Sequence, residues 1–307
     1  MLLALAVTST SLERLFDYLP NGKVPFEAKT DARTVAPPPE WPATGSLEFR
    51  SVTLRYRPSL APSLRGASFT VGAGQRCGIV GRTGAGKSTI LVALFRLVEL
   101  DGGSIHIDGL DAAVLGLGRL RRAMSMIPQE AVLMAGTVRD NLDPFAERTD
   151  AECAAALAQV GLGMGLLHQQ VGGGGDGDGG SSLSVGERQL LAIARALLKK
   201  CRVVCMDEPT SHVDAATDVR VQACVAQAFP NATLLVIAHR LHTVAGFDRL
   251  VVMADGAVQQ VGSPAALLAT KGPLADMAAA LGPEAAAKLR ALAAKGVAKS
   301  EPLLTTG

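Results

Sequence analysis

The spacing of apolar residues along the chain first predicts buried strands. Leu47 and Phe49 alternate with polar residues, and so do Val52 and Leu54, but the phase changes between the two pairs, which predicts a bulge or bend near Ser51. Three short and almost wholly apolar runs, "RCGIV", "VVCMD" and "TLLVIAH", are typical of strands buried on both faces. The chain is therefore expected to contain a buried sheet with an alternating flank beside it.

Helical spacing and capping residues predict helices between these strands. The sequences "TDAE" and "SVGE" are capping boxes that begin helices at Thr149 and Ser184, and Gly161 stands where a C-terminal cap of the first helix belongs. Ser263 before a proline predicts another helix start. A further helix is predicted where apolar residues recur at helical spacing, at Ile90, Leu91, Leu94, Leu97 and Val98.

Together these elements predict an α/β fold with a mainly parallel sheet. The alternating strands over about 46–71 predict an antiparallel β flank, and "VVMADGAVQQV" predicts a hairpin that turns at Asp255-Gly256. The stretch from about 130 to 200 is rich in predicted helix and is expected to form a helical subdomain. Within it, the glycine-dense residues 161–180 predict a flexible loop.

The two ends of the chain differ from this central part. Residues 1–22 are predicted to form a helix with one apolar side, and residues 23–45 form a polar and then Pro-rich linker that ends in "VAPPPEWPATG". The Ala-rich tail, 271–307, is expected to be helical or partly disordered.

Composition and charge exclude some classes of protein. The chain has 307 residues, of which 48% are hydrophobic, so it can bury a sizeable core. A formal net charge of +2 without a block of Lys or Arg disfavours nucleic acid as a partner. The cysteines are scattered and odd in number, which favours reduced thiols; Cys201 and Cys205 leave a metal site open, although small buried residues are the stronger interpretation. No apolar run approaches the ~18–20 residues that span a bilayer.

The stretch "GRTGAGKST" matches the phosphate-binding pattern G-x-x-x-x-G-K-[ST] between a predicted strand and a predicted helix. Gly81 and Gly86 let backbone amides close on phosphates, Lys87 can reach the β- and γ-phosphates, and the Ser88 hydroxyl can bind Mg²⁺. An ordinary glycine turn is the alternative, which the full pattern in its strand-to-helix context disfavours. The pattern alone leaves a kinase, a GTPase and a transport ATPase open.

The stretch "VVCMDEPTSHVD" narrows that choice. Asp207 ends a predicted buried strand, where its carboxylate can bind Mg²⁺, and Glu208 is placed to polarise the water that attacks the γ-phosphate. The alternative is an acidic pair that merely ends a strand in solvent. A second anion-binding element, the helix start at "SVGE", lies far from the glycine loop in sequence.

Taken in order, Tyr56, the glycine loop, Gln129, "LSVGE", "MDEPTSHVD" and His239 resemble the nucleotide-binding domain of an ABC transporter. The wording "YRP", "GIVGRTGAGKST", "DNLDPF", "LSVGERQLL" and "IAHRL" resembles the second cassette of the C subfamily, the multidrug-resistance-associated type, over residues 10–270. The resemblance implies a P-loop NTPase (RecA-like) core within a nucleotide-binding domain at 46–270. It further implies that 1–22 is a remnant of the segment that follows a membrane domain.

The resemblance also implies site roles. Gln129 and His239 would join Glu208 in catalysis, with Gln129 also at the Mg²⁺ held by Ser88 and Asp207, and Asp214 would organise the contact between two cassettes. Each single position also has a structural alternative: Tyr56 could be an aromatic residue on a strand face, Gln129 a solvated glutamine and His239 a structural histidine. The residues implied to bind ATP are Tyr56, Gly81, Arg82, Thr83, Gly84, Ala85, Gly86, Lys87, Ser88, Thr89, Ser184, Gly186 and Asp214, with Ser184 and Gly186 acting on the nucleotide of a partner cassette.

The implied function is an ATP-hydrolysing cassette that powers transmembrane transport, with export of organic anions or conjugates. Its implied partners are a second cassette in a head-to-tail dimer and the membrane domains of a transporter, which would hold it at the cytosolic face of a membrane. The sequence departs from the commonest family pattern at Val185, Glu187 and His212 and in the glycine tract 172–180. A soluble ABC-type ATPase and a non-hydrolysing nucleotide switch are the alternatives, and the second is disfavoured by Glu208 and His239.

Overall fold

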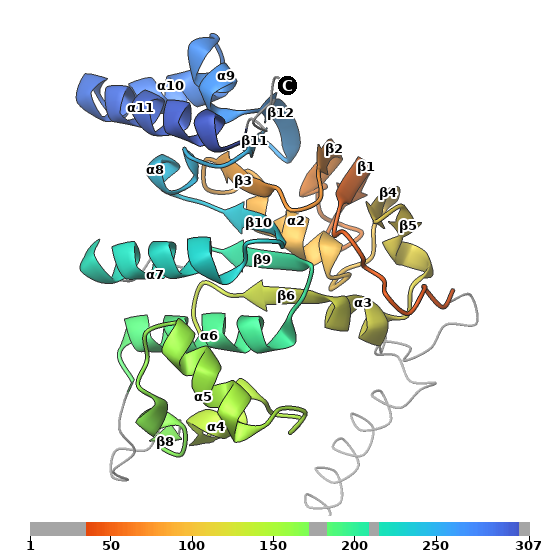
Figure 1. Ribbon diagram of the computed structural model, residues 1–307. Helices are drawn as coiled ribbons and strands as arrows, with labels where there is room; N and C mark the ends of the chain where they lie inside the picture. Colours follow the sequence, from red (N-terminus) through yellow and green to blue (C-terminus); the bar gives the residue numbers. More distant parts are fainter. Residues whose placement is uncertain (1–34, 172–182, 209–214, 301–307) are drawn as a thin grey trace, which may run out of the picture.

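Two main sheets and the helices that cover them make up the computed structural model (Figure 1), which describes residues 35–171, 183–208 and 215–300. The larger sheet is parallel except for the antiparallel pair at one edge, as the buried apolar runs predict. Its six strands, in spatial order, are β12 (Ala257–Gly262), β11 (Arg249–Ala254), β3 (Arg76–Gly81), β10 (Thr233–Ile237), β9 (Val203–Asp207) and β6 (Met124–Ile127).

The smaller sheet is the predicted antiparallel flank. It has the order β2 (Leu64–Val71), β1 (Leu47–Leu54), β4 (Gly102–Ile107) and β5 (Leu110–Asp111). The bulge in β1 is confirmed: Ser51 has a φ of 46°, and the register to β2 shifts between Phe49 and Val52. The extra residue keeps both pairs of apolar side chains of β1 on the buried face.

Two groups of helices lie at opposite ends of the larger sheet (Figure 1). Beyond β6 are α4 (Val138–Leu142), α5 (Asp150–Gln159) and α6 (Val185–Lys199), with the short pair β7 (Gly136–Thr137) and β8 (Gln170–Val171). Beyond β11 and β12 are α9 (Pro264–Ala269), α10 (Pro273–Ala279) and α11 (Pro283–Ser300), and α8 (Leu241–Val244) lies between β3 and α11 (Figure 1). The remaining helices are α2 (Lys87–Leu94), α3 (Leu117–Ala123), α7 (Ala215–Ala228) and the 3₁₀ turns η1 (Ala112–Val114) and η2 (Met164–Leu166).

The predicted capping boxes are present in the helical part. Thr149 and Glu152 exchange hydrogen bonds at the start of α5, and Ser184 and Glu187 do so at the start of α6. Gly161 follows α5 with a φ of 76°, as expected of a C-terminal cap. The predicted loop 161–180 is wrong in its first half, because it contains η2 and β8, and its glycine tract lies outside the described residues.

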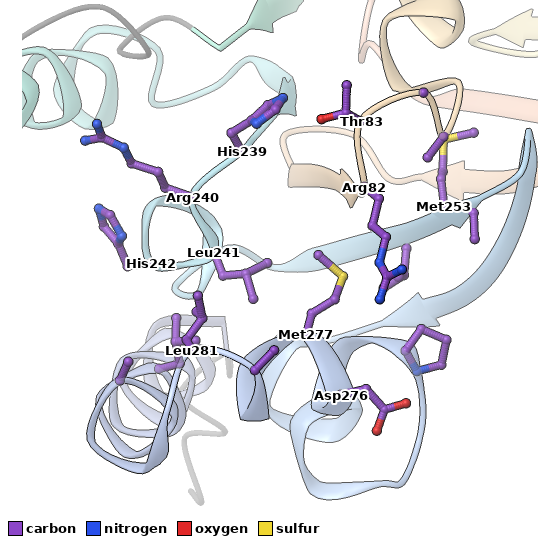
Figure 2. Close-up of a pocket in the computed structure, with 18 of the residues that line it drawn as sticks. Arg82, Thr83, His239, Arg240, Leu241, His242, Met253, Asp276, Met277 and Leu281 are labelled. Carbon is purple, nitrogen blue, oxygen red and sulfur yellow. The ribbon is translucent and has the colours of Figure 1, made fainter.

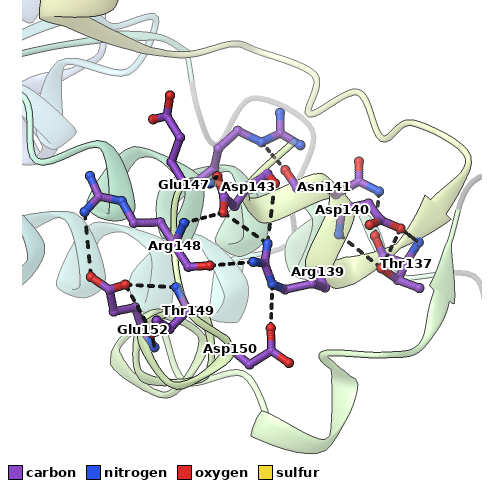
Figure 3. Close-up of polar contacts among 11 residues, drawn as sticks. Thr137, Arg139, Asp140, Asn141, Asp143, Glu147, Arg148, Thr149, Asp150 and Glu152 are labelled. Carbon is purple, nitrogen blue, oxygen red and sulfur yellow. Dashed lines mark hydrogen bonds and ion pairs between the residues drawn. The ribbon is translucent and has the colours of Figure 1, made fainter. Parts of the chain in front are cut away.

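A polar network fixes the connection between α4 and α5 (Figure 3). The Arg139 guanidinium donates to Asp150 at 2.7 Å, to Asp143 at 3.2 Å and to the Arg148 carbonyl at 2.6 Å. Asp143 in turn accepts from the backbone N–H groups of Glu147 and Arg148. Both carboxylates and the connecting backbone are therefore held by one side chain, which gives the helical part a defined shape.

The helix after the glycine loop is shorter than its apolar spacing predicts. α2 ends at Leu94, and Leu97 lies beyond it with 54% of its surface exposed, so the prediction is wrong for its last turn. Arg96 adopts a φ of 46°, and its guanidinium donates to the carbonyls of Ala112 and Leu115. These long-range bonds stabilise a left-handed residue that turns the chain out of the helix.

The Ala-rich segment after residue 270 contributes packed helices. Its buried side chains join the core cluster that covers one face of the larger sheet. Ser263 caps α9 ahead of Pro264, and the hairpin between β11 and β12 turns at Asp255 and Gly256, as predicted. The buried residues contributed by α10 and α11 are Leu274, Ala278, Ala286, Leu289 and Ala293.

The described end of the Pro-rich linker is docked on the smaller sheet. Trp41 is 5% exposed, and its indole N–H donates to the Ile107 carbonyl at 3.0 Å. Arg119 donates to the carbonyl of Trp41 at 2.8 Å. Asp108 accepts from the backbone N–H groups of Thr44, Gly45 and Ser46. None of the helices in the described part of the chain is long and apolar enough to cross a bilayer.

Candidate functional site

Four strand ends of the larger sheet meet at one edge. β9 and β10 pair in register, so that Asp207 lies beside Ile237, two residues before His239. β6 pairs with β9 on the other side, and Gln129 follows β6 after one residue. β3 pairs with β10 and leads into the glycine loop. Because all four strands are parallel, the loops that carry the predicted site residues emerge together.

The glycine loop needs its glycines for close packing. Gly81, Gly84 and Gly86 have φ values of 156°, 80° and 91°. A Cβ at Gly81 would lie 2.3 Å from the Met253 carbonyl oxygen, and one at Gly86 would lie 2.7 Å from that of Ser63. The loop therefore depends on missing side chains at two positions and on positive φ at more than one.

Lys87 is folded back across this loop. Its Nζ donates to the carbonyls of Gly81 at 3.0 Å and Arg82 at 3.2 Å, and the residue is 6% exposed. Burial lowers the pKa of Lys87, while Glu208 and Asp207 act in the opposite direction. Lys87 therefore brings a buried positive charge to the glycine loop, where two carboxylates stabilise its charged form.

Ser88 and Asp207 meet across the loop and the strand end. The Ser88 hydroxyl lies 3.5 Å from Oδ1 of Asp207, at the long limit of a hydrogen bond. Burial raises the pKa of Asp207, and Ser88, Lys87 and His239 counter that shift. The carboxylate is therefore short of positive partners where it stands, and a cation would stabilise its ionised form.

Glu208 and His239 form the closest polar pair of the site. Nε2 of His239 lies 2.5 Å from Oε1 of Glu208; the Glu208 side chain is 11% exposed and that of His239 is 47% exposed. Glu208 has a φ of 45°, which is strained for a side-chain-bearing residue, and its N–H donates to the Ile237 carbonyl at 3.1 Å. Strain of this kind collects at functional positions.

A cavity of about 660 Å³ lies between these groups and the smaller sheet. Lys87, Ser88, Glu208 and His239 all line it, as do Thr83, Gly84, Gly86 and Thr89. The Tyr56 hydroxyl lies 3.2 Å from that of Thr89, so the predicted aromatic residue stands beside the glycine loop, with 46% of its surface exposed. Gln129 is exposed at the end of β6.

A larger cavity of about 1030 Å³ lies on the other side of the glycine loop (Figure 2). Arg82 and Ala85 line this cavity and not the smaller one, whereas Thr83 and His239 line both. Its far wall comes from α10 and α11, with Met277 and Leu281 among the side chains drawn. Lys87, Ser88 and Glu208 line the smaller cavity and not the larger one, so we assign the phosphate site to the smaller cavity despite its size.

The second anion-binding element, the start of α6, does not line the smaller cavity. Ser184 caps α6 and Gly186 lies in its first turn, but no residue of 183–187 lines the cavity beside Lys87. Asp214 lies outside the described residues. Within residues 35–171, 183–208 and 215–300, no three His, Cys, Asp or Glu side chains gather closely enough to hold a metal between them.

Two contacts of the site have no motif that predicts them. Asp218 of α7 lies 3.4 Å from the Arg240 guanidinium, next to His239. The buried amide of Gln189, on α6, donates to the Pro128 carbonyl, next to Gln129. For Asp218 and Gln189 alike, the sequence shows only a polar residue within a helical segment, which does not indicate its distant partner.

Comparison with known proteins shows the family of this domain. Residues 64–211, which begin at β2 and end after β9 in the sequence, match the family model described as ABC transporter. The chain contains an ABC transporter ATPase domain. The match spans the glycine loop, Gln129, "LSVGE" and the Asp207-Glu208 pair, and a domain of this family binds ATP.

Individual relatives agree with the predicted subfamily. The chain is 41% identical over 277 residues to human ATP-binding cassette sub-family C member 2, covering 89% of this chain and 18% of that protein. It is 42% identical over 286 residues to ABC transporter C family member 3 of Dictyostelium discoideum, covering 92% of this chain and 20% of that protein. The chain thus spans about a fifth of the length of these relatives.

A solved structure confirms the fold class. The chain resembles a bacterial Atm1-family ABC exporter with ATP bound, with a TM-score of 0.77 and 30% sequence identity. The likeness covers 91% of this chain and 47% of that one. The predicted P-loop NTPase core with an antiparallel flank and a helical part is therefore confirmed.

Proposed function

We propose that this cassette binds Mg·ATP at the smaller cavity and hydrolyses it to drive transport by an ABC transporter. One observation carries the proposal: Lys87, Ser88, Glu208 and His239 line the same cavity, and Asp207 contacts Ser88. These residues come from three separate segments, yet each has the chemistry that a phosphoryl-transfer site needs.

The phosphates would lie on the glycine loop and at the start of α2. Lys87 would exchange its bonds to the carbonyls of Gly81 and Arg82 for the β- and γ-phosphates, which a short swing of its flexible side chain allows. Tyr56 would stack on the adenine with its exposed ring. The contributing loop residues would be Gly81, Arg82, Thr83, Gly84, Ala85, Gly86, Lys87, Ser88 and Thr89.

Ser88 and Asp207 fit a magnesium ion. Both offer hard oxygen ligands, and the raised pKa of Asp207 marks a buried carboxylate in need of a cation. Gln129 would supply a third oxygen from the neighbouring strand end. When bound, the ion would neutralise charge on the β- and γ-phosphates.

Glu208 would act as the general base. With Glu208 ionised, the hydrogen of its contact with His239 lies on Nε2, so the imidazole fixes Oε1 and leaves Oε2 for the attacking water. The strained backbone of Glu208 and its N–H bond to Ile237 hold the carboxylate at the strand end. His239, at the rim of the same cavity, would also contact the γ-phosphate.

The second anion-binding element would serve a partner. Ser184 and Gly186 open α6 but lie outside this chain's own cavity, which supports a head-to-tail pair in which they cover the γ-phosphate of the other cassette. Asp214 would organise that contact. A second cassette, of the same or another kind, is therefore part of the proposal.

Exposed apolar residues support docking on membrane domains. Val132, Met134 and Phe145 are 74%, 50% and 78% exposed on loops that follow Gln129 and α4. Asn141 holds the Met134 backbone with two hydrogen bonds, so this surface has a defined shape. The C-subfamily likeness supports a position at the cytosolic face of a membrane and the export of organic anions or conjugates.

Nucleotide binding tests the proposal. Lys87→Ala should weaken Mg·ATP binding by about tenfold or more, because a charge-assisted contact to phosphate is lost. Lys271→Ala, at an exposed position before α10, is the matched control and should bind like the parent chain. Equal affinities of the Lys87→Ala variant and the parent chain, in equilibrium titration with a fluorescent ATP analogue, would contradict the assignment.

A further inference from the structure

A partly buried hydrogen bond joins α6 to the loop that carries Gln129. Gln189 lies on α6 and is 2% exposed, and its side-chain Nε2 donates to the Pro128 carbonyl at 3.0 Å. The two residues are 61 positions apart in sequence, so the bond exists only because α6 packs against the end of β6.

This bond fixes one peptide unit. The Pro128 carbonyl belongs to the planar peptide that continues into Gln129, so its orientation constrains where Gln129 begins. Proline has no N–H, which leaves that carbonyl as the backbone group through which Pro128 can be held. A buried amide without its partner is costly, so Gln189 and Pro128 are expected to move together.

α6 is one uninterrupted helix, so its start and its middle are rigidly connected. Its middle is buried, with Leu191, Ile193 and Ala194 fully enclosed, and Arg195 donates to the Asn141 carbonyl at 2.8 Å. Ser184 caps the same helix only five residues before Gln189, which is about 7.5 Å of helix at ~1.5 Å per residue. A displacement of the capped end therefore reaches Gln189 without an intervening joint.

We propose that Gln189 is a positioning residue that couples the start of α6 to Gln129. Contact of a partner cassette with Ser184 and Gly186 shifts α6, and Gln189 transfers the shift through Pro128 to Gln129 at this chain's own metal and water site. The inference rests on the proposed function, because it assigns Gln129 to that site. It adds a physical link by which one nucleotide site senses closure at the other.

The test compares two bonds made by the same helix. Gln189→Leu removes the donor at similar volume, and Arg195→Lys disturbs the contact of α6 with Asn141 but not the one with Pro128. Mg·ATP affinity of the dilute chain, turnover, the Mg²⁺ concentration for half-maximal turnover and Tm are measured for both. Gln189→Leu should lower turnover or raise the Mg²⁺ requirement about tenfold, as loss of an outer-shell partner does, with ATP affinity unchanged.

A pH profile separates positioning from mere stability. In Gln189→Glu the carboxyl group can donate to Pro128 only when it is protonated, and burial favours that form. Turnover of this variant relative to the parent chain should therefore fall as pH rises. If Gln189→Leu does not fold, the pH profile of Gln189→Glu still tests the proposed role of Gln189.

Two results would overturn the inference. One is a Gln189→Leu variant that loses Tm like Arg195→Lys but keeps the parent turnover and Mg²⁺ requirement. The other is a Gln189→Glu variant whose relative turnover does not change with pH. Either result leaves the proposed function standing, whereas a parent chain that fails to bind Mg·ATP would remove the function itself.

Discussion

Nε2 of His239 lies 2.5 Å from Oε1 of Glu208, although the two residues follow different strands of the sheet. The contact places an acceptor for a proton and the group that orients it at one cavity wall. Glu208 directly follows Asp207 in sequence, but the Asp207 carboxylate contacts the Ser88 hydroxyl instead. Two adjacent acids therefore have different partners and, in our proposal, different tasks.

The first prediction concerns the general base. Glu208→Gln should keep Mg·ATP affinity and lose turnover by about 10²–10⁴-fold, because an amide cannot accept the proton of the attacking water. His239→Ala should also lose turnover, while His242→Ala, on α8 and lining only the larger cavity, serves as control. Near-normal phosphate release by the Glu208→Gln variant would point to another base.

The second prediction concerns Asp207 and pH. Burial raises the pKa of Asp207 in the folded chain, so this carboxyl favours folding below its unfolded pKa and loses that contribution as pH rises through the folded value. Asp207→Asn should therefore raise Tm of the nucleotide-free chain in EDTA, by more at pH 8 than near pH 4, which is close to the ordinary pKa of an aspartate. Thermal unfolding at both pH values measures this.

The same variant should respond less to ligand. Mg·ATP raises Tm of the parent chain by mass action, and Asp207→Asn should gain less because its amide is a weaker ligand for Mg²⁺. Ser104→Ala, at a half-buried position on β4 in the smaller sheet, is the control. An equal gain in Tm for Asp207→Asn and the parent chain would remove Asp207 from the metal site.

The third prediction concerns the linker. Deleting residues 1–30 should leave Mg·ATP affinity unchanged, because the described contacts of the linker begin later, with the bond from the Val35 N–H to the Val114 carbonyl and the docking of Trp41 on the smaller sheet. Trp41→Ala should lower the free energy of unfolding by about 3–5 kcal/mol, as loss of a buried aromatic side chain does. Urea unfolding and nucleotide titration measure the two effects, and a large loss of affinity on deletion would place the domain boundary earlier.

Local chemistry explains what the sequence predicts well. Caps, the Asp255-Gly256 turn and the glycine loop depend on residues within a few positions of one another, and each lies where the pattern places it. The early end of α2 was not predictable, because Arg96 turns the chain through bonds to Ala112 and Leu115. The docking of Trp41 on Ile107 depends equally on distant partners.

The site residues likewise divide into those that local sequence patterns predict and those whose contacts depend on distant partners. Patterns place Asp207 and Glu208 at a strand end and Lys87 and Ser88 at the helix start after the glycine loop, and the parallel register then brings them together. The contact between Glu208 and His239 and the bond from Gln189 to Pro128 need the packed sheet and α6. Pairings of this kind leave no trace in the spacing of residues.

The fourth prediction tests the reason for two anion-binding elements. Ser184→Arg should spare ATP binding by this chain's own glycine loop and block closure over a partner's nucleotide, whereas Lys87→Ala should weaken Mg·ATP binding at its own site and abolish turnover there. In a head-to-tail pair of one variant with the other, one composite site contains both lesions and the other contains neither. If Ser184 is only a helix cap, its substitution costs about 1 kcal/mol of stability and nothing else.

The most direct measurement is ATP turnover in a mixture of Ser184→Arg and Lys87→Ala chains, with heterodimer formation followed by native mass spectrometry. Each variant alone should be inactive, and the mixture should recover turnover that rises with protein concentration as mass action forms the pair. Heterodimers that form but remain inactive, or a parent chain whose turnover never depends on concentration, would contradict a nucleotide site completed by the α6 start of a partner.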